Sequence, residues 1–109
     1  MLNEKHINKF CKINNYSYNY FGDVAIITTG VDQWYLELVS TYNERSWDYE
    51  ERIRLKHKNR KGNRTGKAHF HTQRYVKDID CAFQTIRSHE ENSRDFNKAF
   101  KVKSIINAI

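Results

Sequence analysis

The sequence predicts an α+β fold: an antiparallel sheet of about four to five strands with an N-terminal helix and two C-terminal helices on one face. Three observations predict it. Apolar and polar residues alternate with a period of two through the middle of the chain. Both ends show the helical period of about 3.6 instead. The alternating segments are joined by short connections with Gly, Asn and Asp, which suit antiparallel neighbours. A length of 109 residues fits a single basic domain, 1–109.

The first expected element is a short helix at residues 3–12. Asn3 is a suitable N-cap, and Glu4 lies in the first turn, where the helix dipole favours a negative charge. Leu2 and Ile7 occupy the two positions of a hydrophobic staple, so both are expected in the core.

The middle of the chain is expected to form strands, which are recognised by alternation and by β-branched residues. They are residues 16–21, 24–29, 33–41, 51–58 and 67–75. In the fourth strand Ile53, Leu55 and His57 share one face, and basic residues occupy the other. Residues 30–32 are expected as a tight turn, and residues 43–49 as a polar connection that holds Trp47.

After the last strand the period changes to that of a helix, which is expected to continue to about Glu90. Its apolar face is formed by Val76, Ile79, Ala82, Phe83 and Ile86. Asn92 or Ser93 can cap a last helix. The acids near this region are expected on helix surfaces: Asp78, Asp80, Glu90 and Glu91.

Positive charge is concentrated in one quarter of the chain. Residues 52–77 hold ten of the 19 Lys and Arg residues and none of the 13 acids, so the remainder is acidic. Such a field attracts polyanions and speeds their association. The segment therefore predicts a binding role rather than a chemical reaction.

The basic residues fall on a predicted hairpin of residues 51–58 and 67–75, whose apolar face turns to the core. The other face is expected to contact nucleic acid or a nucleoprotein complex through phosphates and hydrogen bonds. The candidate binding residues are Arg52, Arg54, Lys56, Lys58, Arg60, Lys61, Arg64, Lys67, His69, His71, Gln73 and Arg74. An alternative function for the same face is that of an adaptor, which would bind an acidic protein surface.

Histidines offer a second alternative. His69 and His71 are two apart on one strand, a spacing that can present two metal ligands or an acid–base pair for phosphodiester cleavage. This makes a small nuclease the enzymatic alternative. No third ligand is evident, because His57 is expected on the opposite face. The sequence has no cofactor motif, and no cofactor or metal is expected.

An aromatic stripe of Tyr16, Tyr18 and Tyr20 lies on one face of the first strand. Such a stripe can stack on bases or anchor a protein, but it more often belongs to the core. No apolar run has the roughly 20 residues that a membrane helix needs, and no signal peptide is expected. The chain is therefore expected in the cytoplasm, with Cys11 and Cys81 as free thiols.

The length, the aromatic and Asn- and Lys-rich composition and the absence of motifs resemble small proteins of phages and mobile elements, among them anti-CRISPR proteins. The resemblance is one of overall style across the whole chain, so no functional residue of those proteins can be assigned to a position in this sequence. It implies a stoichiometric inhibitor that occludes a host nucleoprotein complex such as a CRISPR effector, inside an infected bacterial cell.

Overall fold

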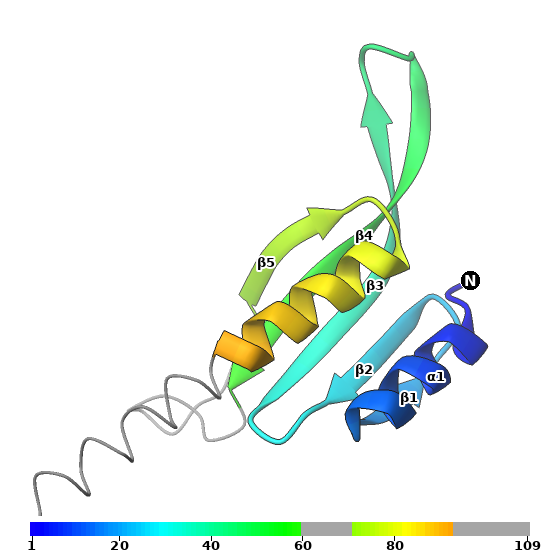
Figure 1. Cartoon of the computed structure of the whole chain (residues 1–109). Helices are drawn as coiled ribbons and strands as arrows, with labels where there is room; N and C mark the ends of the chain where they lie inside the picture. Colours follow the sequence, from blue (N-terminus) through cyan, green and yellow to red (C-terminus); the bar gives the residue numbers. More distant parts are fainter. Residues whose placement is uncertain (60–70, 93–109) are drawn as a thin grey trace, which may run out of the picture.

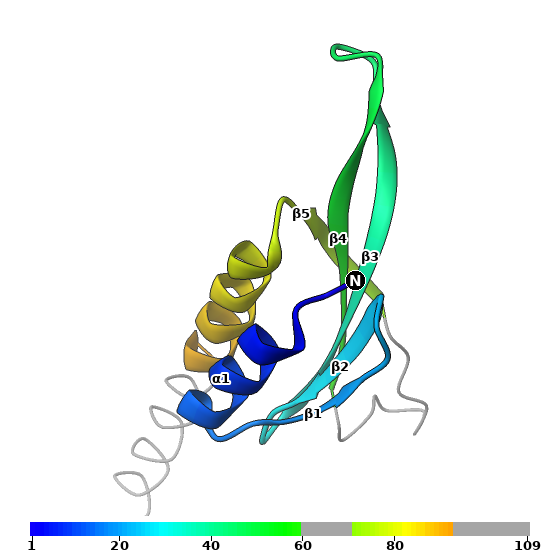
Figure 2. The ribbon, with the colours of Figure 1, turned by 90° about the vertical axis from the view of Figure 1, so that its right-hand side faces the viewer.

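The computed structural model describes residues 1–59 and 71–92, with the backbone alone at residue 59 and residues 71–73. Its strands form one antiparallel sheet in the order β1-β2-β3-β4-β5. They are β1 (Ser17–Tyr20), β2 (Val24–Thr28), β3 (Asp32–Asn43), β4 (Asp48–Asn59) and β5 (His71–Val76). Both described helices, α1 (Glu4–Asn14) and the C-terminal helix (residues 79–92), cover the same face of the sheet (Figures 1 and 2). The predicted α+β fold is confirmed; the last predicted helix lies outside the described residues.

Helix α1 begins and ends as local chemistry dictates. The Asn3 side chain accepts a hydrogen bond from the His6 N–H at 3.2 Å, so Asn3 is the N-cap as predicted. The helix runs two residues past the predicted end, to Asn14, and stops because Asn15 adopts a left-handed conformation with φ 59°. No helix in the described part of the chain combines the length and apolarity needed to cross a membrane.

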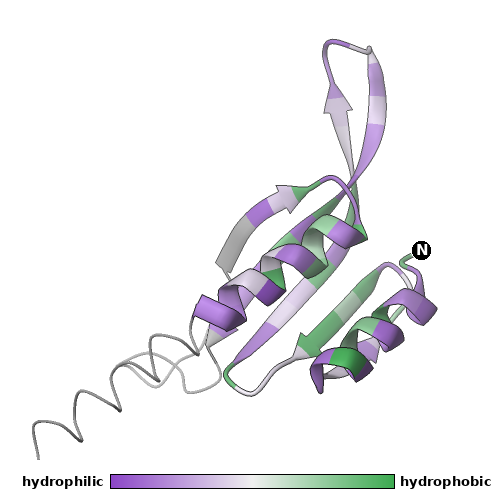
Figure 3. Ribbon diagram, in the orientation of Figure 1, coloured by the Kyte–Doolittle hydropathy of each residue, from purple (hydrophilic) through white to green (hydrophobic). Residues whose placement is uncertain are grey.

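The core lies between the helices and the inner face of the sheet. Trp34 and Leu36 on β3 and Leu55 on β4 are fully buried, as alternation predicts. Ile7 from α1 and Ile86 from the C-terminal helix pack onto them. Figure 3 shows hydrophobic residues along β2.

Strands β3 and β4 extend into the predicted polar connection of residues 43–49 and leave a turn at residues 44–47. Both β3 and β4 continue beyond their neighbours and pair only with each other from Val39 opposite Arg52 to Asn43 opposite Asp48. This two-stranded arm (residues 39–52) projects from the sheet (Figure 1). Trp47 turns at its tip with φ 57° and is 81% exposed. The prediction ended both strands early because the arm has no apolar face to show an alternation.

A β-bulge changes the expected facing of β5. Leu55 lies opposite Arg74, but the next residue, Lys56, lies opposite Thr72, so Gln73 is the extra residue. Val76 also belongs to this strand and is buried, rather than starting the helix. The C-terminal helix starts after Asp78, whose carboxylate accepts a hydrogen bond from the Cys81 N–H at 2.9 Å.

Candidate functional site

A row of four cations lies on the outer face of the sheet, opposite both helices. The row consists of Arg52, Arg54, Lys56 and Lys58. These residues alternate along β4 with Ile53, Leu55 and His57, which are buried, so their side chains project from the other face. Each is half-buried. We call this set the outer cation row, and its facing agrees with the sequence-based prediction.

Carboxylates of the protein itself neutralise half of the outer cation row. Arg54 forms an ion pair with Glu37, which lies directly opposite on β3, and Arg52 pairs with Glu50 two residues earlier. The hydrogen bond from Arg54 lowers the pKa of Glu37, so this carboxylate stays charged. The Lys56 ammonium lies 5.2 Å from the centroid of the Tyr35 ring. The two arginines of the row are therefore matched by acids from outside residues 52–77.

Other residues of the predicted site are not in the row. Arg60, Lys61, Arg64, Lys67 and His69 lie outside the described residues. The register places His71 opposite buried His57, and Gln73 is the bulge residue, so neither holds the expected position beside the row.

Arg74 lies apart from the outer cation row. Its guanidinium donates a hydrogen bond to Thr85 Oγ1 at 2.8 Å, and Thr85 belongs to the C-terminal helix. Arg74 therefore reaches toward the side of the sheet that the helices cover, and it cannot extend the outer cation row. Its position opposite Leu55, on the inner face, is the physical reason.

The tyrosine stripe belongs to the core surface. Tyr20 donates a hydrogen bond to the Leu2 carbonyl at 2.8 Å, and Tyr18 donates one to Glu4 at 3.4 Å. Both rings are half-buried beneath α1. Their interactions are thus used within the fold, which is the usual role of such a stripe.

A buried polar cluster of Asp32, His57 and His89 lies at the end of β3 and β4 that is remote from the arm. Asp32 Oδ2 lies 3.1 Å from His57 Nε2 and 3.4 Å from His89 Nδ1. Asp32 begins β3, His57 is on β4, and His89 is on the C-terminal helix. Asp32 is 1% exposed and His57 is 8% exposed, so a charge here is poorly solvated.

Two further side chains line this polar cluster. The Trp34 ring contacts both imidazoles: it is tilted against His57, with centroids 4.6 Å apart, and edge-on to His89, with centroids 5.1 Å apart. Its indole N–H donates to Glu90 Oε1 at 3.0 Å. Burial, together with the nearby Asp32 carboxylate, raises the pKa of Glu90. The prediction that Glu90 lies on the helix surface is wrong, because this residue is 4% exposed.

Local sequence explains how the cluster is positioned. The Thr29 hydroxyl accepts hydrogen bonds from the N–H groups of Val31 and Asp32, at 3.2 and 2.9 Å, which shapes the turn that presents Asp32. His89 and Glu90 follow Ile86 by three and four residues, so they continue the apolar face of the helix. This spacing is the sequence signal that places both residues on the inward side of the helix.

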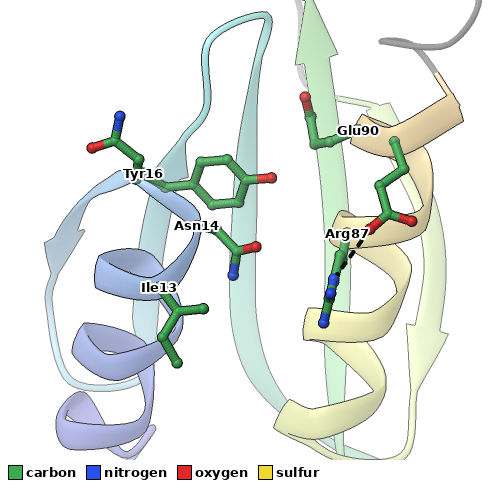
Figure 4. A pocket seen from close by; sticks show the side chains of 7 residues that line it. Ile13, Asn14, Tyr16, Arg87 and Glu90 are labelled. Carbon is green, nitrogen blue, oxygen red and sulfur yellow. Dashed lines mark hydrogen bonds and ion pairs between the residues drawn. The ribbon is translucent and has the colours of Figure 1, made fainter.

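A pocket of about 370 Å³ borders this region between the end of α1 and the C-terminal helix. Tyr16, Asn14 and Ile13 line one side, while Glu90 and Arg87 line the other (Figure 4). The Arg87 guanidinium pairs with Glu91 at 3.2 Å. Glu90 thus lines the pocket and is also hydrogen-bonded to Trp34 of the polar cluster.

Comparison with protein families, with curated proteins and with solved structures gave no match.

Proposed function

We propose that this protein binds nucleic acid, free or within a nucleoprotein complex, through the outer cation row, and that it acts as a non-enzymatic binding protein. The observation that carries the proposal is the alignment of four cations along one strand, on the sheet face that no described helix covers. A phosphate backbone is a linear array of negative charges, which such a row can follow.

The charge balance of the row sets its strength. The Glu37 and Glu50 carboxylates offset the charges of Arg54 and Arg52, two of the four cations of the row. The sequence adds four cations and no acid at residues 60–67. Arg can also form forked hydrogen bonds to phosphate, whereas Lys acts as a point charge. We therefore expect binding that is electrostatic and falls steeply with salt.

The test removes charge from the row and, separately, from the opposite side of the molecule. Lys56→Ala/Lys58→Ala changes the outer face, and Lys5→Ala/Lys9→Ala removes the same charge from the exposed surface of α1. Fluorescence anisotropy with labelled duplex and single-stranded RNA and DNA gives affinity at several salt concentrations. We expect the row variant to reduce the slope of log affinity against log salt by about 1.8 on duplex DNA, since each phosphate contributes roughly 0.9.

The helix variant is expected to retain the slope of the unmodified protein. Salt-insensitive binding, or an equal loss in both variants, would contradict the proposal. The same labelled strands run on a denaturing gel, with divalent metal and with chelator, test the nuclease alternative. Cleavage activity that remains with the protein through successive purification steps would show that the protein is a nuclease.

A specific observation favours a nucleoprotein complex over bare nucleic acid. The arm carries Tyr42, Trp47 and Tyr49, each more than half exposed, and its residues 40–51 include four acids and one base. Exposed aromatic side chains are typical of protein interfaces, and an acidic arm repels phosphates. A molecule with a basic face and an acidic, aromatic arm suits a partner that has both nucleic acid and protein.

Such binding would inhibit the partner by occlusion, because the bound protein covers a surface of the complex that a guide or target strand needs. The expected partner class includes CRISPR effectors. Adding the protein to an RNA-guided nuclease should inhibit target cleavage with an endpoint near one protein per complex, and Trp47→Ser should weaken inhibition without changing affinity for bare nucleic acid. Inhibition that excess nonspecific DNA abolishes would instead indicate simple competition for the substrate.

A further inference from the structure

We propose that Asp32, His57 and His89 form a binding site for a divalent transition metal ion of the Zn²⁺ type. One ligand atom from each of the three side chains lies within 4.8 Å of the other two. This inference is independent of nucleic-acid binding, because the polar cluster lies on the inner face of the sheet and the outer cation row lies on the other.

Two of the three separations between ligand atoms match those of a metal centre. Zn²⁺ bonds to His nitrogen and carboxylate oxygen measure about 2.0–2.1 Å, so tetrahedral geometry separates the ligand atoms by about 3.3–3.4 Å. Asp32 Oδ2 lies 3.1 Å from His57 Nε2 and 3.4 Å from His89 Nδ1. Small movements of the two rings would give all three atoms a common centre.

A hydrogen-bonded ion pair explains these contacts less well. Despite the short separations, Asp32 Oδ2 accepts no hydrogen bond from the residues that the structure describes, and His89 Nδ1 makes none there either. Both atoms are buried, and a buried polar atom normally has a partner. A cation held between them would supply one and would neutralise the Asp32 charge.

The surroundings suit metal retention. Trp34 is fully buried and contacts both imidazole rings, which limits water access on that side and restricts the orientation of the rings. Two imidazoles and one carboxylate are the donor set of Zn²⁺ and of non-haem Fe²⁺ sites, both of which keep positions for other ligands. The His89 side chain is 36% exposed and is therefore the side from which an ion can enter.

The site joins three elements that are distant in sequence. Strand β3, strand β4 and the C-terminal helix each supply one ligand, so a bound ion would fasten that helix to the sheet. We therefore expect binding of the metal ion to raise the thermal stability of the protein.

The experiment uses Co²⁺ as a spectroscopic substitute for Zn²⁺ in the full chain. Trp47→Phe leaves Trp34 as the single tryptophan, because the chain has two. We expect one equivalent of Co²⁺ to give the visible absorption of a tetrahedral or five-coordinate centre, to quench Trp34 fluorescence, and to be displaced by Zn²⁺ with a rise in melting temperature.

His89→Ala is the informative variant, because His89 is partly exposed and its loss should leave the fold intact by circular dichroism. We expect this change to weaken Co²⁺ affinity about tenfold or more, which is the scale of damage seen when a metal site loses supporting contacts. His6→Ala removes an exposed imidazole from α1 and is the matched control, with unchanged affinity expected. Absence of stoichiometric binding by the unmodified protein would overturn the proposal. So would binding that His69→Ala abolishes and His89→Ala leaves unchanged, because the ion would then lie at the H-x-H pair.

Discussion

Removing the carboxylates that accompany the outer cation row should strengthen binding to nucleic acid. Glu37 and Glu50 each form an ion pair with one arginine of the row. Glu37→Gln/Glu50→Gln keeps the shape of both side chains and releases two guanidinium charges. The net positive charge of the row then rises by two. At roughly 0.9 per phosphate, the slope of log affinity against log salt should steepen by up to about 1.8 on duplex DNA.

This magnitude is measurable over an ordinary salt range. A slope change of about 1.8 means that a fourfold rise in salt, from 50 to 200 mM, weakens the variant roughly tenfold more than the unmodified protein. Anisotropy titrations at four salt concentrations would measure it. Glu44→Gln/Glu51→Gln changes the net charge equally, but on exposed arm residues for which no ion pair is described. If the row variant binds no more tightly than the unmodified protein at low salt, or if the arm variant gains as much, the row does not contact phosphates.

Three further outcomes follow from the packing and the ionisable groups. Ile86→Ala should lower the free energy of unfolding by about 2–5 kcal/mol in urea titrations, because Ile86 is fully buried between helix and sheet. A loss below about 1 kcal/mol would mean that the C-terminal helix is not packed there. Burial raises the pKa of the Cys11 thiol to about 11, so at pH 8 a maleimide should label Cys81 quickly and Cys11 only in denaturant, as peptide mass spectrometry would show. The pKa of Glu37 is lowered from 4.5 by Arg54, so its ion pair stabilises the fold above about pH 4.5 and is lost as the pH falls. The stability advantage over Glu37→Gln should therefore be present at pH 7 and disappear in acid, and an advantage that grows in acid would contradict the assigned ion pair.

Much of the fold was predictable because burial follows local periodicity. Asn3 and Leu2 marked the start of α1, and the alternation in β4 correctly assigned Leu55 to the core and Lys56 to the outer face. The arm was missed because neither of its faces is apolar, which leaves no alternation to recognise. The bulge at Gln73 was missed because its single extra residue carries no distinctive side chain.

The candidate sites divide in the same way. Alternation alone was enough to predict that β4 presents a row of cations on one side and that His57 shares the other side with the core, since a strand turns successive residues to opposite faces. Only the tertiary structure decided which groups these residues meet. Glu37 lies opposite Arg54 because of strand register, and Asp32, His57 and His89 converge because the C-terminal helix packs across the sheet. The physical reason is that the facing of a side chain depends on its own strand or helix, whereas its contacts depend on how distant elements pair and pack.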